Sequence, residues 1–220
     1  MNKDNLRLDY FMDPKIRLYQ HLDHFHFNTD TKLLAQFMKI KKGDVVLDIG
    51  TNNGALLLYA DQFDVAALIG VEILEESSKI AQLNADSFMK HSCQIIHAPI
   101  QEVEHDLVDV IVSNPPFFTQ NETHPNTVMN MRQLGRVEVY CDLDDLCKHA
   151  SRLLKSMGRF YFVHRPDRIH EIFLALAQYN FSVKTLQFAY DARNDAVKTV
   201  LIEAVKDSKC RCKVLPMVML

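Results

Sequence analysis

The sequence predicts a single α/β domain: a doubly wound, Rossmann-like, mostly parallel sheet of seven strands with an antiparallel hairpin at one edge. Short β-branched apolar runs alternate with stretches of helical periodicity, which is typical of parallel strands joined by crossover helices. Two strand-like runs then follow each other near the C-terminus and indicate an antiparallel pair. The 220 residues suffice for one sizeable core and are too few for two full domains with a linker.

The first half of the chain carries a β-α-β-α order. A buried strand is expected directly after the turn signal at Gly43 and Asp44, and glycines break it. The expected elements are strand 45–49, helix 55–60, strand 66–71, helix 77–89, strand 94–97 and strand 107–112. We expect residues 1–40 to form an N-terminal extension with a first helix packed on the core, and residues 41–220 to form the main domain.

The second half begins with a polar stretch over 119–135, the best candidate for a mobile loop. An apolar stripe from Leu143 indicates a helix with Asp142 as its N-cap, and Gly158 is expected to end that unit. Strand 159–163, helix 166–179 and the strand pair 182–189 and 199–205 complete the predicted fold.

Composition excludes several classes of protein. Apolar residues make up 48% and charged residues 24% of the chain, which excludes a disordered or fibrous protein. No apolar run approaches the roughly 18 to 20 uncharged residues of a membrane span, and Met1 leads into charge rather than a signal peptide. We therefore expect a cytoplasmic protein that does not enter a membrane, and nothing in the sequence indicates an obligate protein partner.

Neither a metal site nor a strongly basic surface is indicated. The five cysteines are scattered without CxxC spacing, so they suggest no disulfide framework and no zinc site. We predict that the protein binds no metal. The formal net charge of −3 is not the footprint of nonspecific nucleic-acid binding, so an RNA substrate would have to be held by local patches.

A glycine-bearing turn from Asp48 to Gly54 lies between the first predicted strand and helix. Glycines allow a tight turn and the close approach of a nucleotide, and Asn52, at the place of a middle glycine, tolerates left-handed backbone better than most residues. Glu72 follows about 20 residues later at a strand end, where an acidic side chain accepts hydrogen bonds from ribose hydroxyls. These two features predict an adenosine-containing cofactor without separating a methyltransferase from a nicotinamide enzyme.

The tetrapeptide Asn114-Pro115-Pro116-Phe117 distinguishes a methyltransferase from a nicotinamide enzyme. It lies just past the fourth strand, where ligands bind in open α/β sheets. Two prolines hold a loop rigid and offer carbonyl acceptors without competing N–H donors. The Asn114 amide oxygen and the Pro115 carbonyl can accept both hydrogens of an adenine amine as its nitrogen pyramidalises. Phe117 can stack on the base, and the tetrapeptide predicts amine methylation.

On these residues the chain resembles class I methyltransferases of the NPPY/F type, and within them the bacterial tRNA1(Val) adenine-N6 methyltransferases and their Firmicute-type relatives. The resemblance runs from about residue 8 to residue 216. The segments that carry it are Phe25-His26-Phe27-Asn28-Thr29-Asp30 and residues 46–54, 70–72, 112–117, 136–140 and 163–168.

The resemblance implies methyl transfer from S-adenosylmethionine to an adenine in the tRNA anticodon loop. The implied cofactor-binding residues are Asp48, Gly50, Thr51, Asn52, Gly54, Glu72, Ile100 and Asn114. The implied catalytic loop is Asn114, Pro115, Pro116 and Phe117. Two positions depart from the family: Asn52 replaces a glycine, and Pro99 replaces an acid that accepts from the cofactor's adenine amine.

Basic side chains are the expected contacts to RNA phosphates, which position a nucleic acid without reading its sequence. The candidates are Arg132, Arg136, Arg165, Arg168, Lys209, Arg211 and Lys213.

Three other functions remain open at this point. A protein glutamine N-methyltransferase would use the same acceptors, but such enzymes carry a helical N-terminal domain and here the first strand begins at Val45. A DNA adenine methyltransferase would need a target-recognition region, for which little room follows Phe117. A noncatalytic relic that binds RNA or the cofactor would account for Asn52 and Pro99.

Overall fold

The structure, a computed structural model, describes residues 5–24, 26–117 and 141–220. The polar stretch predicted as a loop over 119–135 lies outside the described residues, as do Arg132 and Arg136.

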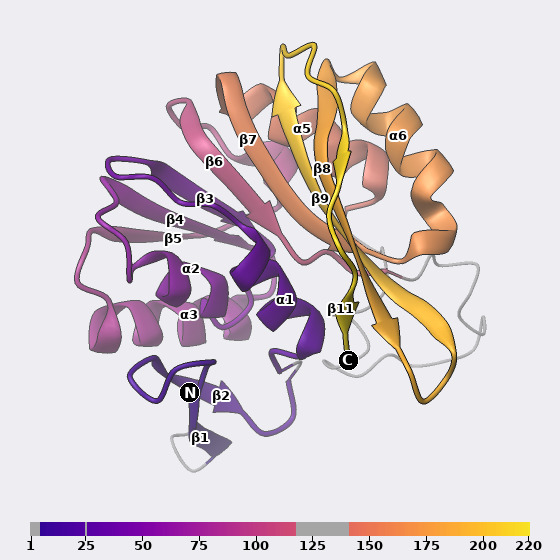
Figure 1. Ribbon diagram of the computed structural model, residues 1–220. Coiled ribbons are helices and arrows are strands. Elements are labelled where there is room, and N and C mark those ends of the chain that lie inside the picture. The colour runs from indigo at the N-terminus through magenta and orange to yellow at the C-terminus, as the bar shows by residue number, and fades with distance from the viewer. Residues whose placement is uncertain (1–4, 25, 118–140) are drawn as a thin grey trace, which may run out of the picture.

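A twisted sheet with helices on both faces forms the core, which confirms the predicted doubly wound fold (Figure 1). Within the described residues the sheet has nine strands in the order β10-β8-β9-β7-β6-β3-β4-β5, with β11 beside β8. The strands are β3 (Val45–Ile49), β4 (Ala67–Glu72), β5 (Cys93–His97), β6 (Val108–Ser113), β7 (Leu154–His164), β8 (Phe181–Asp191), β9 (Ala196–Lys206), β10 (Lys213–Val214) and β11 (Val218–Met219). Strand β9 runs antiparallel to both β7 and β8, so the predicted hairpin is present.

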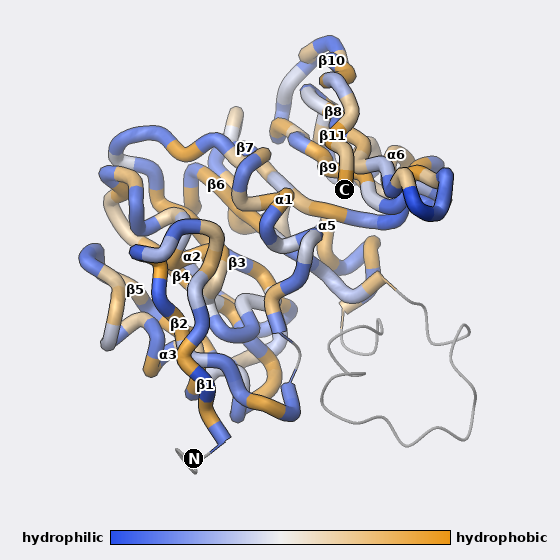
Figure 2. Tube along the Cα trace, turned by 60° about the horizontal axis from the view of Figure 1, so that its bottom comes forward, coloured by the Kyte–Doolittle hydropathy of each residue, from blue (hydrophilic) through white to orange (hydrophobic). Residues whose placement is uncertain are grey.

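The helices divide between the two faces of the sheet. Helices α1 (Thr29–Phe37), α2 (Ala55–Ala60) and α3 (Glu75–Phe88) cover one face, and α5 (Leu143–Leu153) and α6 (Ile169–Gln178) cover the other. Successive strand residues point to opposite faces, so Val46 packs toward α1 and α2 while Leu47 packs toward α5. The apolar residues of the central strands can be followed in Figure 2.

Helix α5 begins where the sequence predicts. The Asp142 carboxylate accepts from the Asp145 backbone N–H at 2.8 Å, which makes it the N-cap. The prediction that Gly158 ends this unit is wrong. The helix stops at Leu153 and β7 begins at once, with Met157 in left-handed backbone and a shift in register against β6 between Val108 and Val110. Gly158 is needed inside the strand for another reason: a Cβ there would lie 2.7 Å from the Lys155 carbonyl oxygen.

An antiparallel hairpin of β1 (Leu6–Tyr10) and β2 (Arg17–His21) precedes the main sheet and was not predicted. The buried Asn84 side chain of α3 fastens it, accepting from the Tyr19 N–H at 2.7 Å and donating to the Tyr19 carbonyl at 2.9 Å. Asn84 also donates to the Asn53 carbonyl at 2.8 Å, and the Asn53 amide donates to Gln20 at 3.0 Å. The hairpin is therefore joined to the turn that follows β3.

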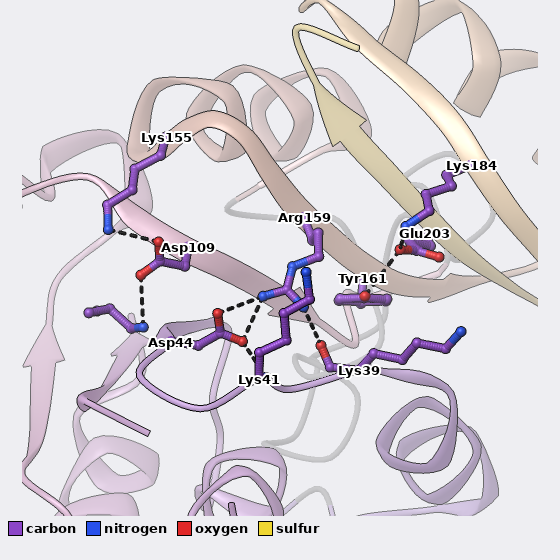
Figure 3. Close-up of polar contacts among 10 residues, drawn as sticks. Lys39, Lys41, Asp44, Asp109, Lys155, Arg159, Tyr161, Lys184 and Glu203 are labelled. Atoms are coloured by element: carbon purple, nitrogen blue, oxygen red, sulfur yellow. Dashed lines mark hydrogen bonds and ion pairs between the residues drawn. The ribbon is translucent and has the colours of Figure 1, made fainter. Parts of the chain in front are cut away.

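Polar contacts brace the amino ends of β3, β6 and β7 (Figure 3). Arg159 donates to both carboxylate oxygens of Asp44, at 2.7 and 2.6 Å, and both side chains are buried. Asp109 accepts from the Val45 backbone N–H at 3.0 Å and from Lys155 at 2.7 Å. These contacts hold the three strands together at their amino ends.

Candidate active site

A cleft opens beyond the carboxyl ends of β3, β4 and β6, where an open α/β sheet binds ligands. The strands pair side by side in parallel, so residues far apart in the sequence meet at this edge. The predicted site residues that line the cleft are Asp48, Gly50, Thr51, Asn52, Glu72, Ile100, Asn114, Pro115 and Pro116. Gly54 and Phe117 do not line it.

The turn after β3 is folded back on β4. The N–H groups of Gly50 and Thr51 both donate to the Val71 carbonyl, at 2.9 and 3.0 Å. Gly50, Asn52 and Gly54 have φ values of 73°, 51° and 79°. Asparagine is one of the few residues other than glycine that adopts such backbone readily, so Asn52 keeps the turn that a glycine would make.

Glu72 connects the two loops that flank the cleft. Its buried carboxylate accepts from the Asn52 N–H at 2.8 Å and from the Leu74 N–H at 2.9 Å. Burial raises the pKa of Glu72, and the backbone hydrogen bonds oppose that shift. The side chain is therefore held at the end of β4 with its oxygens between the two loops.

Asp48 has a carboxylate oxygen without a partner. The side chain is only 1% exposed, and its Oδ2 accepts from the Thr51 hydroxyl at 2.8 Å. Its Oδ1 is buried and has no hydrogen-bond partner in the described structure. Burial, with a smaller contribution from the nearby Glu72, raises the pKa of Asp48 to about 7. A buried acceptor of this kind suits a ligand that brings a positively charged donor.

Asn114 directly follows β6, and the NH2 group of its side-chain amide is hydrogen-bonded. Its Nδ2 donates to the Thr31 hydroxyl of α1 at 2.9 Å, which leaves Oδ1 as an acceptor. Pro115 and Pro116 continue the cleft wall. The Phe117 ring lies against His164 instead, with ring centroids 5.3 Å apart. Three residues of the motif therefore line the cleft, and Phe117 packs against the end of β7.

The end of the cleft near Pro99 is mainly apolar, with Ile73, Ala98, Ile100 and Leu146 beside it. Proline has no acidic group and no N–H, and its carbonyl already accepts from the Glu102 N–H at 3.0 Å. The departure from the family's acid at this position leaves backbone groups and apolar side chains to form this end of the cleft.

Phe27, Thr31 and Asn53 also line the cleft, and none of them was predicted as a site residue. One signal was available for Thr31. Asn28 and Thr31 are spaced as an N-cap and its third helical residue, and the structure forms this capping box at the start of α1. No local signal joins Asn53 to Gln20, because 33 residues separate them.

The predicted phosphate contacts fall into two groups. Arg165 and Arg168 follow the carboxyl end of β7 and so lie at the cleft end of the sheet, where they pair with Asp167 and Glu171. Lys209 and Arg211 lie in the chain that follows β9, near the amino end of β8, where the Ser182 hydroxyl contacts the Ser208 carbonyl. Lys213 follows them in β10, which pairs with β8. The structure does not bring the two groups together.

Two kinds of feature are absent from the described segments: a cluster of metal ligands and a membrane-spanning helix. These segments contain no gathering of three or more His, Cys, Asp or Glu side chains suited to holding a metal ion. In the same segments no helix has both the length and the apolarity needed to cross a bilayer.

Comparison with known proteins gives three kinds of match. The family model described as methyltransferase small domain matches residues 23–180. A Phocaeicola vulgatus protein named tRNA1(Val) (adenine(37)-N6)-methyltransferase is 27% identical over 207 residues, which cover 92% of this chain and 86% of that relative. A Porphyromonas gingivalis protein of the same name is 32% identical over 141 residues, covering 60% of this chain and 54% of that relative. The solved structure of a predicted O-methyltransferase from Agrobacterium tumefaciens shares the fold, with a TM-score of 0.67 at 16% identity and 87% coverage of each chain.

Proposed function

The chain belongs to the methyltransferase small domain family, and on that premise we propose that it methylates the N6 amine of an adenine in tRNA, with S-adenosylmethionine as its cofactor. The proposal depends on one observation at Asn114: its amide NH2 donates to the Thr31 hydroxyl, which leaves Oδ1 available as an acceptor at the cleft. The names of the similar proteins support tRNA as the substrate. A tRNA-modifying activity also fits the cytoplasmic location expected from the sequence.

The residues of the cleft fit the cofactor. S-adenosylmethionine, when bound, supplies an electrophilic methyl group on a sulfonium and carries an ammonium group and ribose hydroxyls. The buried, unpartnered Oδ1 of Asp48 suits the ammonium group, and the carboxylate of Glu72 suits the hydroxyls. The turn from Gly50 to Gly54 lets backbone approach closely. The apolar end near Pro99 suits a flat adenine ring, which this chain would hold without an acid.

The Asn-Pro-Pro loop positions and polarises the amine. An adenine amine is a weak nucleophile because its lone pair is delocalised into the ring. Acceptors at Asn114 Oδ1 and the Pro115 carbonyl would stabilise the nitrogen as it pyramidalises, and they are fixed before the reaction by the rigid loop. The methylated amine is acidic and can release its proton to water, so the chain supplies orientation and acceptors rather than a general base.

The ionisation of Asp48 is expected to control cofactor affinity. A bound ammonium group favours the carboxylate, so binding must remove a proton from Asp48 at low pH. With the pKa of Asp48 at about 7, the affinity for S-adenosylmethionine is expected to fall about tenfold from about pH 7.5 to about pH 6, measured by calorimetry. The stability that Asp48 contributes without cofactor has the opposite dependence: it is present at low pH and is lost as the pH rises through about 7.

The control for this pH dependence is Asp48→Asn, which keeps the shape of the side chain and removes its charge. This variant is expected to bind the cofactor more weakly and with little pH dependence between the same limits. Wild-type affinity that stays constant across this range would contradict the pairing of Asp48 with the ammonium group.

The proposed substrate is tested by supplying purified protein and labelled S-adenosylmethionine with three acceptors: unmodified tRNA, free adenosine and duplex DNA. We expect transfer to tRNA alone. An anticodon loop presents unpaired bases, whereas duplex DNA must first be opened, and free adenosine has no phosphates for basic side chains to hold. Nucleoside mass spectrometry would identify the product as N6-methyladenosine. Equal rates on duplex DNA would remove tRNA from the proposal, and cofactor binding without transfer to any acceptor would favour a noncatalytic protein.

A further inference from the structure

Thr31 is placed to decide which way the Asn114 amide faces. Its side chain lies in the first turn of α1 and lines the cleft, and it is only 6% exposed. We infer that Thr31 is a positioning residue, which holds the Asn114 amide with its oxygen toward the cleft. The inference rests on the proposed function only for the consequence of that orientation, not for the orientation itself.

Two hydrogen bonds between Thr31 and Asn28 have a backbone N–H as the donor, so their direction is fixed. The Thr31 N–H donates to Asn28 Oδ1 at 3.0 Å, so the Asn28 amide turns its oxygen toward α1. The Asn28 N–H points at the Thr31 hydroxyl oxygen at 3.3 Å, which must accept. These two contacts form the capping box of α1, and they set the direction of every bond that follows.

After this contact with the Asn28 N–H, the Thr31 hydroxyl can still donate one hydrogen bond and accept one more. It lies 3.1 Å from Asn28 Oδ1, an oxygen that can only accept, so its single proton is donated there. A hydroxyl oxygen accepts at most two hydrogen bonds, and the Asn28 N–H occupies one of these positions. The remaining lone pair faces the Asn114 amide at 2.9 Å. Only the NH2 group of Asn114 can meet it, so the amide oxygen is directed away from Thr31.

Two further hydrogen bonds hold the first turn of α1 in place. Asn28 Nδ2 donates to Asp30 at 3.4 Å, which agrees with the direction of the Asn28 amide set by the backbone. The Thr199 hydroxyl of β9 donates to Asp30 at 2.7 Å, so the first turn of α1 is fastened to the sheet. The orientation of Asn114 thus depends on a helix terminus that lies 83 residues earlier in the chain.

The test compares Thr31→Val, which keeps the shape of the side chain and removes the hydroxyl, with Thr31→Ser, which retains the hydroxyl. With saturating cofactor and tRNA, Thr31→Val is expected to lower kcat about tenfold, since one neutral hydrogen bond no longer selects the amide orientation. The KM values are expected to change little, and Thr31→Ser is expected to stay within about threefold of wild type. Thr29→Val is the matched control, because Thr29 is exposed on the same helical turn.

Three results would overturn the positioning role: unchanged kcat in Thr31→Val, an equal loss in Thr31→Ser, or a loss carried by KM and by thermal stability alone. The last two would show that the methyl group or the helix cap matters rather than the amide orientation.

A second readout does not depend on methyl transfer. In protein labelled with 15N-asparagine, the Asn114 side-chain amide is identified by its absence in Asn114→Ala, and its proton exchange with water is measured. Thr31→Val is expected to speed this exchange at least about tenfold, and Thr31→Ser to leave it nearly unchanged. Unchanged exchange in Thr31→Val would overturn the orientation. The expected exchange pattern in a protein that fails to methylate tRNA would instead retain the orientation and overturn the proposed function.

Discussion

Replacing Asn114 with alanine is expected to slow methyl transfer at least about a hundredfold while the affinity for S-adenosylmethionine stays nearly unchanged. The variant loses an acceptor that is fixed in place before the reaction, and deleting one preorganised polar contact to a transition state has an effect of this size. The fold is expected to persist, since the side chain lies at the cleft and makes its contact to Thr31 from there. Single-turnover rates on tRNA measure the chemical step, and calorimetry measures the affinity.

The control for Asn114→Ala is Gln82→Ala, which removes a surface amide that donates to Asp86 on α3. This control is expected to react at the wild-type rate. If Asn114→Ala also reacted at close to the wild-type single-turnover rate while binding cofactor normally, the Asn-Pro-Pro loop would be structural and the reacting amine would lie elsewhere.

Local patterns in the sequence are sufficient to predict the central strands of the sheet and the residues that lie at their carboxyl ends. The strand β3 and the helix α2 are found at the predicted residues, because a buried β-branched run and a glycine turn are both local signals. The same holds for Asp142 at the start of α5. Parallel strands place their carboxyl ends at one edge, so a prediction of strand ends also predicts that Asp48, Glu72 and Asn114 meet.

Contacts between distant segments are not predictable in this way. The first hairpin was missed because β1 and β2 are only five residues long, and because Asn84, which fastens them, lies 65 residues from Tyr19. The contact between Thr31 and Asn114 depends on where α1 docks, and no periodicity records that. The packing of Phe117 against His164 depends likewise on the pairing of β6 with β7.

The basic residues show a second limit. Arg165 and Lys209 look alike in the sequence as candidates for phosphate contacts, but β7 and β9 run antiparallel. The segment after β7 therefore lies at the cleft end of the sheet, and the segment after β9 lies at the other end. Charge alone does not contain this information, since it depends on strand direction.

Replacing Glu72 with alanine is expected to weaken S-adenosylmethionine binding at least about thirtyfold. The carboxylate is the proposed acceptor for the ribose hydroxyls, and hydrogen bonds to charged groups contribute about 1.5–3 kcal/mol each. The same side chain accepts from the N–H groups of Asn52 and Leu74, so its loss also leaves these two donors without their acceptor. We therefore expect the free energy of unfolding to fall as well, by about 2 kcal/mol, measured by chemical denaturation.

Two variants separate the binding role of Glu72 from its bracing role. Glu72→Gln keeps the shape of the side chain and one acceptor oxygen, so it can accept from only one of the two backbone N–H groups. It is therefore expected to recover only part of the stability while binding the cofactor more weakly than wild type. Glu75→Ala removes a mostly exposed carboxylate that pairs with Lys79 in the first turn of α3, and it is expected to change cofactor affinity less than about twofold. A Glu72→Ala protein that loses stability but binds S-adenosylmethionine with wild-type affinity would show that Glu72 only braces the loops, and the ribose would then have to bind elsewhere in the cleft.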